Sequence, residues 1–186
     1  QEEISQGGGR IAGHLGLDNL IMFYDANDIQ LSTETGEVMT EDTAMKYRSW
    51  GWHVIEINGN DCQQIRQALD EAKAENQRPT LIIGKCIMGK GARKADNTSY
   101  EHSCKTHGAP LGGDAYKNTI LNLGGDLENP FVIFDDVKEM YARREEELKA
   151  IVAERHREEQ AWAEANPEKA AQQAEWFSGK APRIDW

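Results

Sequence analysis

Residues 52–83 read WHVIEINGNDCQQIRQALDEAKAENQRPTLII, and this stretch decides the fold. WHVIEI (52–57) and PTLII (79–83) are short apolar runs rich in β-branched residues, which is typical of strands. Between them, Asp61 precedes a segment whose apolar residues Ile65, Leu69 and Ala72 recur at helical spacing. A strand, a helix and a second strand joined by short connections predict a βαβ unit, and therefore a parallel sheet.

The residues before this unit extend the same pattern. LIMFY (20–24) is a continuous apolar run, which predicts a strand buried on both faces. Glu41-Asp42-Thr43 predicts the cap of a helix that runs to Trp50 and is stopped by Gly51. Residues 4–17 contain five glycines but keep Ile4, Ile11 and Leu15 at near-helical spacing, so we expect a short helix packed closely against a neighbour. The fold class predicted for the chain is α/β, a parallel sheet with flanking helices.

The character of the chain changes after Lys85. Residues 88–114 are rich in Gly, Lys, His and Asn, and so long a loop in a compact domain is usually functional or disordered. A short helix is expected over 114–123. Asp135-Asp136 then predicts the cap of a long charged helix with a sparse apolar stripe, and Pro167 begins another helix that ends at Ser178-Gly179. We therefore divide the chain into a domain over 1–128 and a charged C-terminal helical arm over 129–186.

Composition excludes several classes of function. Acidic residues outnumber basic ones by 32 to 21, for a formal charge of −11, which argues against a nucleic-acid or membrane-surface role. Three cysteines without paired spacing indicate a reducing, cytoplasmic compartment. No apolar run approaches a membrane span. The opening Gln-Glu-Glu-Ile is neither an initiator Met nor a signal peptide, so we expect an excised fragment.

In parallel α/β sheets, ligands bind at the carboxyl ends of the strands. The first loop at such an end is Asp25–Leu31, and its plainest interpretation is a polar turn in which Asn and Asp bond their own backbone. The alternative is a hard-cation site, because the Asn27 side-chain oxygen and the Ile29 carbonyl can face one ion. A magnesium ion held by so few protein groups would imply a bound diphosphate.

The second loop contains EHSCKTHGAPLG (101–112), for which three interpretations stay open. His102, Cys104 and His107 offer zinc ligands, although their spacing matches no strong zinc pattern. The loop is otherwise a mobile glycine- and lysine-rich segment. In the third interpretation, His107 is anchored by the Gly-Ala-Pro turn and acts as a proton shuttle or phosphate donor.

Taken together, these motifs resemble transketolase. The stretches that carry the resemblance keep the family's order and similar spacing: EEIS (2–5), IAGHLGL (11–17), FYDANDIQL (23–31), TEDTAMKYRSWGWHVIEINGND (40–61) and THGAPLG (106–112). The resemblance covers most of the chain and implies a partial thiamine diphosphate-binding fold. It also implies transfer of a two-carbon ketol unit from a ketose phosphate to an aldose phosphate by an intact homodimeric enzyme of the pentose phosphate pathway.

The resemblance assigns roles to six residues. Asn27 and Ile29 would ligate Mg²⁺ or Ca²⁺, the first through its side chain and the second through its carbonyl. His107 matches the family histidine near the cofactor diphosphate and the reacting end of the substrate. The remaining contacts with thiamine diphosphate or its acidic network fall to Ile29, Leu31, Met88 and Glu2.

The sequence departs from the family in three places. The Gly-Asp-Gly opening of the cofactor signature would lie upstream of Gln1, so we expect the fragment alone to be inactive and to lack the pyrimidine-binding and C-terminal domains. Gly7–Arg10 replaces a stretch that usually holds a second network glutamate, and the loop over 96–105 is longer than usual. Two alternatives remain: a related enzyme, such as deoxyxylulose-phosphate or dihydroxyacetone synthase, and a non-catalytic interaction module.

Overall fold

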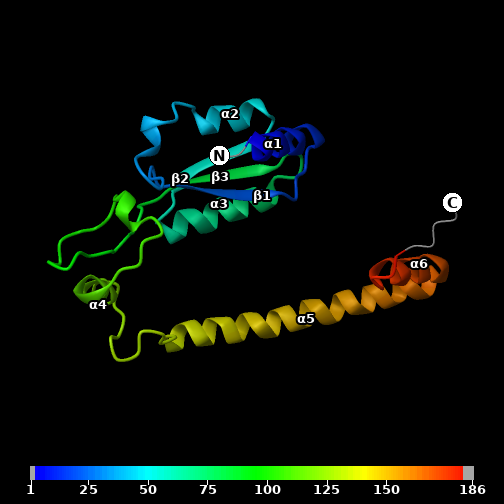
Figure 1. Ribbon diagram of the computed structural model, residues 1–186. Helices are drawn as coiled ribbons and strands as arrows, with labels where there is room; N and C mark the ends of the chain where they lie inside the picture. Colours follow the sequence, from blue (N-terminus) through cyan, green and yellow to red (C-terminus); the bar gives the residue numbers. More distant parts are fainter. Residues whose placement is uncertain (1–2, 182–186) are drawn as a thin grey trace. The chain divides into compact units, whose positions relative to one another are not determined.

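The computed structural model describes the backbone of residues 3–181 (Figure 1) and the burial of side chains from residue 5 to residue 181. The chain forms two compact units, Gln1–Pro130 and Phe131–Trp186.

The first unit is built on a three-stranded parallel sheet. Its strands are β1 (Ile21–Ala26), β2 (His53–Asn58) and β3 (Thr80–Lys85), in the order β1-β3-β2. Thr80 pairs with Ile21 on one side and with His53 on the other, so all three strands start level. The parallel sheet predicted from the sequence is confirmed. Because β3 has a partner on each side and helices over both faces, its residues Thr80 to Ile82 are fully buried.

The expectation that residues 20–24 are buried on both faces is wrong for part of that run. β1 lies at an edge of the sheet, and the Phe23 side chain is 43% exposed. The helix on that face, α3 (Cys62–Ala74), packs on β2 and β3, so it leaves Phe23 with little cover. Phe23 lies over Gly84 of the neighbouring strand, where an added Cβ would come within 2.3 Å of the Phe23 ring.

Helix α1 (Glu3–Leu15) packs through small residues rather than through its large apolar ones. Ala12 is buried with Trp52 and Leu81, and a Cβ on Gly13 would lie 1.9 Å from the Trp50 carbonyl oxygen. The Trp52 indole Nε1 donates to the carbonyl of Gly9 at 2.8 Å. The predicted close packing of this helix is confirmed.

The predicted apolar stripe of α1 does not form its packing face. Ile11 and Leu15 are each 61% exposed, because the helix turns its small residues toward the tryptophans. A backbone can approach an indole ring closely only where no Cβ intervenes, and this contact sets the rotation of the helix.

Both other flanking helices are capped by an aspartate, and the cap predicted at Asp42 is confirmed. The Asp42 side chain accepts from Met45 N at the start of α2 (Thr43–Ser49). The Asp61 side chain accepts from the amides of Gln63 and Gln64 at the start of α3. Helices α1 and α2 cover one face of the sheet and α3 covers the other (Figure 1). On α3 the buried residues are Ala68 and Ala72, whereas Leu69 is partly exposed, so the predicted stripe is rotated slightly.

Three short elements complete the first unit. A 3-10 turn, η1 (Thr35–Glu37), lies between β1 and α2. A second 3-10 turn, η2 (Cys104–Thr106), interrupts the long loop after β3. The loop then enters α4 (Gly113–Asn122), which confirms the helix expected over 114–123.

The second unit consists of α5 (Asp135–Ala165) and α6 (Pro167–Phe177), and neither helix has a buried residue. The capping prediction for α5 is wrong: Phe134 is the N-cap, and Asp135 and Asp136 lie in the first turn. There their charges still favour the positive end of the helix dipole. None of the helices within residues 3–181 combines the length and the apolar character needed to cross a bilayer.

The contact between α1 and Trp50 gives a test with a matched control. We expect Gly13→Ala to lower the free energy of unfolding by about 1–3 kcal/mol, because the new methyl group has no space beside the Trp50 carbonyl. Gly8→Ala, in the same helix with nothing within 4 Å of the new Cβ, should instead raise it by about 0.5–1 kcal/mol. Urea unfolding of both variants measures the difference. Equal effects would contradict the packing described here.

Candidate functional site

The loops that follow β1 and β3 start side by side. The two strands pair in register to their ends, Ala26 with Lys85, so both loops leave the sheet at the same rim. Cys86 N donates to the Ala26 carbonyl at 3.3 Å, and Lys85 forms an ion pair with Asp28. The tertiary structure therefore brings the start of the second predicted loop against the first.

Asn27 forms a turn directly after β1. Its side-chain Oδ1 accepts from Ile29 N at 3.0 Å, and Asp28 between them has a φ of 65°. Thr35 N donates to the Asp28 carbonyl at 2.8 Å, which closes the loop behind the turn. Ile29 is 9% exposed and anchors the segment.

The oxygens of this turn fit a hard cation. A carboxamide oxygen has two lone pairs, and the bond from Ile29 N occupies one of them. The Ile29 carbonyl accepts no hydrogen bond within the described part of the chain. Both atoms are neutral oxygen donors of the type that Mg²⁺ and Ca²⁺ take, and two such donors would need anionic ligands from elsewhere.

The other predicted residues differ in their surroundings. Leu31 is 74% exposed. Met88 is half-buried, and its carbonyl accepts from His102 N at 3.0 Å. The His107 side chain is exposed at the end of η2, where its backbone N donates to the Cys104 carbonyl at 3.1 Å. Glu2 lies outside the described residues.

Met88 and His107 belong to segments that touch each other. A Cβ on Gly89, next to Met88, would lie 2.8 Å from Thr106 Oγ1, next to His107. Gly89 also has a φ of 62°, a conformation that favours glycine. The loop thus folds back so that the turn carrying His107 lies against the segment leaving β3. The zinc interpretation is wrong for this loop, since no group of three or more His, Cys, Asp or Glu in the described structure is placed to hold a metal.

Two residues at this rim were not singled out from the sequence. Burial raises the pKa of the Cys86 thiol above its ordinary value, and a hydrogen bond with Asp25 acts in the same direction. Glu101 accepts from Gly91 N at 2.8 Å, and this bond lowers the pKa of its carboxyl group. The pKa shifts of both residues arise from contacts between different segments of the chain. Residue type and spacing in the sequence therefore do not indicate them.

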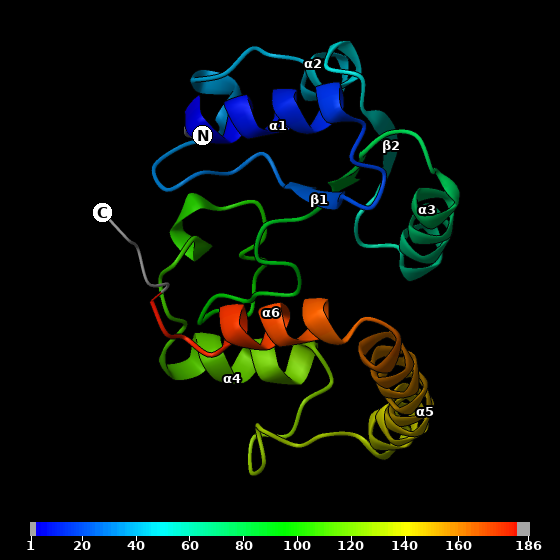
Figure 2. The same cartoon turned by 90° about the vertical axis from the view of Figure 1, so that its right-hand side faces the viewer.

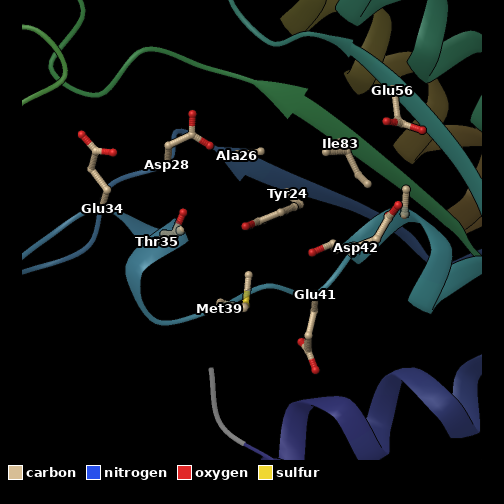
Figure 3. Close-up of a pocket in the computed structure, with 13 residues that line it drawn as sticks. Tyr24, Ala26, Asp28, Glu34, Thr35, Met39, Glu41, Asp42, Glu56 and Ile83 are labelled. Carbon is tan, nitrogen blue, oxygen red and sulfur yellow. The ribbon is translucent and has the colours of Figure 1, made fainter.

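A separate hollow of about 400 Å³ lies on the sheet face beneath η1 and the start of α2 (Figure 3). Tyr24 and Ile83 contribute to its lining, which also carries five carboxylates and no Lys, Arg or His. Four of the five already have partners in the fold: Asp28 with Lys85, Glu41 with Lys46, Asp42 with Met45 N, and Glu56 with Arg48. None of the predicted cofactor residues that the structure describes lines this hollow, and its charge disfavours a diphosphate.

Residues 1–182 match the family model described as transketolase, thiamine diphosphate binding domain. The chain belongs to the transketolase family. The family predicted from the motifs is therefore confirmed.

Individual relatives agree with the family model. The chain is 35% identical over 181 residues to a transketolase from Nostoc sp., covering 96% of this chain and 26% of the relative. It is 39% identical over 174 residues to transketolase 1 from Pasteurella multocida, covering 92% and 25%. A Pichia stipitis transketolase structure matches with a TM-score of 0.86 and 31% identity, covering 98% of this chain and 26% of that one. The chain thus spans about a quarter of the length of these relatives.

The carboxyl group of Glu101 makes the stability of this transketolase domain depend on pH. Because its pKa is lowered in the folded state, the stabilisation is present above the ordinary value of 4.5 and is lost as the pH falls through the folded-state pKa. We therefore expect the Gly91 amide to lose hydrogen-exchange protection under acid conditions, after correction for the intrinsic exchange rate. In Glu101→Gln the side-chain oxygen still accepts the hydrogen bond from Gly91 N, but the side chain does not titrate. The hydrogen-exchange protection of the Gly91 amide in this variant should therefore no longer follow the protonation of a carboxyl group at this position. An identical pH dependence in the variant would refute the assignment.

Proposed function

We propose that this chain supplies the thiamine diphosphate-binding part of a transketolase, which transfers a two-carbon ketol unit from a ketose phosphate to an aldose phosphate. The observation that carries the proposal is the shared rim. The turn of Asn27 and the loop that carries His107 leave neighbouring strands at the same end of the sheet, where α/β folds bind ligands. The family model and the relatives named above support the same reaction.

In this proposal, Asn27 Oδ1 and the Ile29 carbonyl ligate Mg²⁺ or Ca²⁺, and the diphosphate of the cofactor completes the shell. Ile29, Leu31 and Met88 provide apolar contacts for the cofactor. When bound, thiamine diphosphate supplies the electron sink for the carbanion left when the ketose is cleaved. The Leu31 side chain is exposed, as expected if its main contact in this proposal is with a bound ligand.

His107 donates a hydrogen bond to the diphosphate or to the reacting end of the substrate in this proposal. Its side chain is exposed while its backbone is fixed at the end of η2, so the imidazole is free to meet a ligand. Glu2 is proposed to join the acidic network that links the two sites of a homodimer. We place the domain boundary near residues 128–129 and the protein in the cytoplasm, where the cysteines Cys62, Cys86 and Cys104 remain free thiols.

Dihydroxyacetone synthase is a second candidate, because the enzyme of that name from Pichia angusta is 32% identical over 175 residues. A non-catalytic module that keeps the fold would retain the sheet but bind no cofactor. Cofactor binding distinguishes the two enzymes from the non-catalytic module. Acceptor preference distinguishes transketolase from dihydroxyacetone synthase.

The cation site is tested by titrating the full-length protein with thiamine diphosphate and Mg²⁺ in a calorimeter. Asn27→Ala should weaken cofactor binding by about a hundredfold or more, equivalent to about 2.7 kcal/mol. Asn27→Asp keeps an oxygen ligand and should retain binding, and Asn76→Ala, an exposed residue after α3, is the neutral control. Unaltered affinity in Asn27→Ala would remove the metal-site assignment, and no binding by the wild type would favour the non-catalytic module.

Activity of the full-length protein with xylulose 5-phosphate and ribose 5-phosphate as a pair tests the reaction. His107→Asn should lower kcat by about a hundredfold, because asparagine keeps a polar side chain but does not titrate. His102→Asn is the control in the same loop, since Asn tolerates the φ of 55° found there. Equal kcat in the two variants would contradict the role of His107, and failure of the substrate pair would favour the synthase.

A further inference from the structure

The loop between β3 and α4 encloses a second hollow of about 560 Å³, and none of the described residues assigned to the cofactor is among those that line it. Its walls carry two lysines, Lys94 and Lys105, two serines, Ser99 and Ser103, and Tyr100. Ammonium groups, hydroxyl donors and a phenol are the side-chain chemistry that recognises a small anion.

Helix α4 lies next to the loop that leaves β3 (Figure 2), and its side chains hold the backbone of that loop. Asn118 Nδ2 donates to the carbonyls of Lys94 and Ala95 at 3.0 and 3.2 Å. Asn122 Nδ2 donates to the Gly91 carbonyl at 2.9 Å, and Thr119 Oγ1 accepts from Arg93 N at 2.9 Å. Three side chains of one helix therefore hold residues 91–95 in place, and this segment includes Lys94 and Ala95 of the wall.

The two lysines of the hollow are not held in ion pairs, although the charge of Lys94 acts on the nearby Asp96 carboxylate. Neither Lys94 nor Lys105 is among the ion pairs of residues 3–181, and Lys94 Nζ lies 5.7 Å from the centre of the Tyr100 ring. The hydroxyl of Ser103 accepts from Lys105 N at 3.3 Å, which leaves its proton available to a ligand.

Two carboxylates stand near these lysines, and both have other partners. Glu101, which lines the hollow, accepts from Gly91 N and from Ser99 Oγ at 2.8 and 3.4 Å. Asp96 accepts from the amide and hydroxyl of Thr98 at 3.0 and 2.6 Å. These hydrogen bonds hold the two carboxylates in place and favour their ionised form, so the carboxylates offset part of the positive charge while both ammonium groups stay free to meet a ligand.

We propose that this hollow binds a phosphoryl dianion, either free phosphate or the phosphate group of a sugar phosphate. Lys94 and Lys105 supply the charge, and Ser103 supplies a hydroxyl donor. The chain as a whole carries a formal charge of −11, so an anion is held only where positive charge is concentrated. The site does not depend on the proposed thiamine diphosphate chemistry.

The test is residue-resolved acylation of lysines in the full-length protein, purified without thiamine diphosphate and analysed by mass spectrometry. Inorganic phosphate should slow acylation of Lys94 and Lys105 severalfold and saturably, relative to sodium chloride at equal ionic strength. Lys73, an exposed lysine of α3, is the internal control and should react at the same rate in both salts. Equal protection at all three lysines, or none, would overturn the proposal.

Calorimetry with inorganic phosphate then measures the site as a whole. The double variant Lys94→Gln/Lys105→Gln should bind about tenfold more weakly, whereas Lys73→Gln should match the wild type. Unchanged affinity in the double variant would also overturn the proposal.

The acylation experiment distinguishes the two possible ligands. Protection of Lys94 and Lys105 against acylation by ribose 5-phosphate but not by ribose assigns the site to phosphate esters as well. Protection by inorganic phosphate alone assigns it to the free ion. A cofactor titration of the wild type decides the proposed function separately.

Discussion

The pairing of β1 with β3 is the constraint on which the rest of the first unit depends. Because these strands run parallel and end level, the Asn27 turn and the segment after Lys85 are forced to the same rim. The ion pair between Lys85 and Asp28 and the hydrogen bond from Cys86 to Ala26 continue that pairing into the loops. A shift in register would separate the two loops and dismantle the candidate site, while leaving each turn locally intact.

Small residues allow the layers around this sheet to approach closely. Gly13 lets α1 reach the Trp50 carbonyl, and Gly84 lets the Phe23 ring lie over β3. The large apolar residues Ile11 and Leu15 remain exposed as a result. On the face covered by α1, burial therefore depends on the close fit of glycine and alanine against the tryptophans as well as on the size of the apolar side chains.

The long loop after β3 is ordered by polar contacts instead of an apolar core. The α4 residues Asn118 and Asn122 bind its backbone carbonyls, and Glu101 holds the Gly91 amide. Such a loop presents exposed lysines and His107 on a fixed backbone. The hollow in this loop is lined by two lysines, whereas the hollow beneath η1 is lined by carboxylates.

The sequence by itself determined the strands, the cap at Asp42 and the family, because these depend on local periodicity, local hydrogen bonds and ordered motifs. It identified Asn27 and His107 as candidates by residue type and motif. Only the tertiary structure decided that β3 is central, that α1 packs through Gly13, and that Glu101 and the two lysines gather beside α4. Those facts depend on contacts between segments distant in sequence, and such contacts leave no periodic signal in the residues that make them.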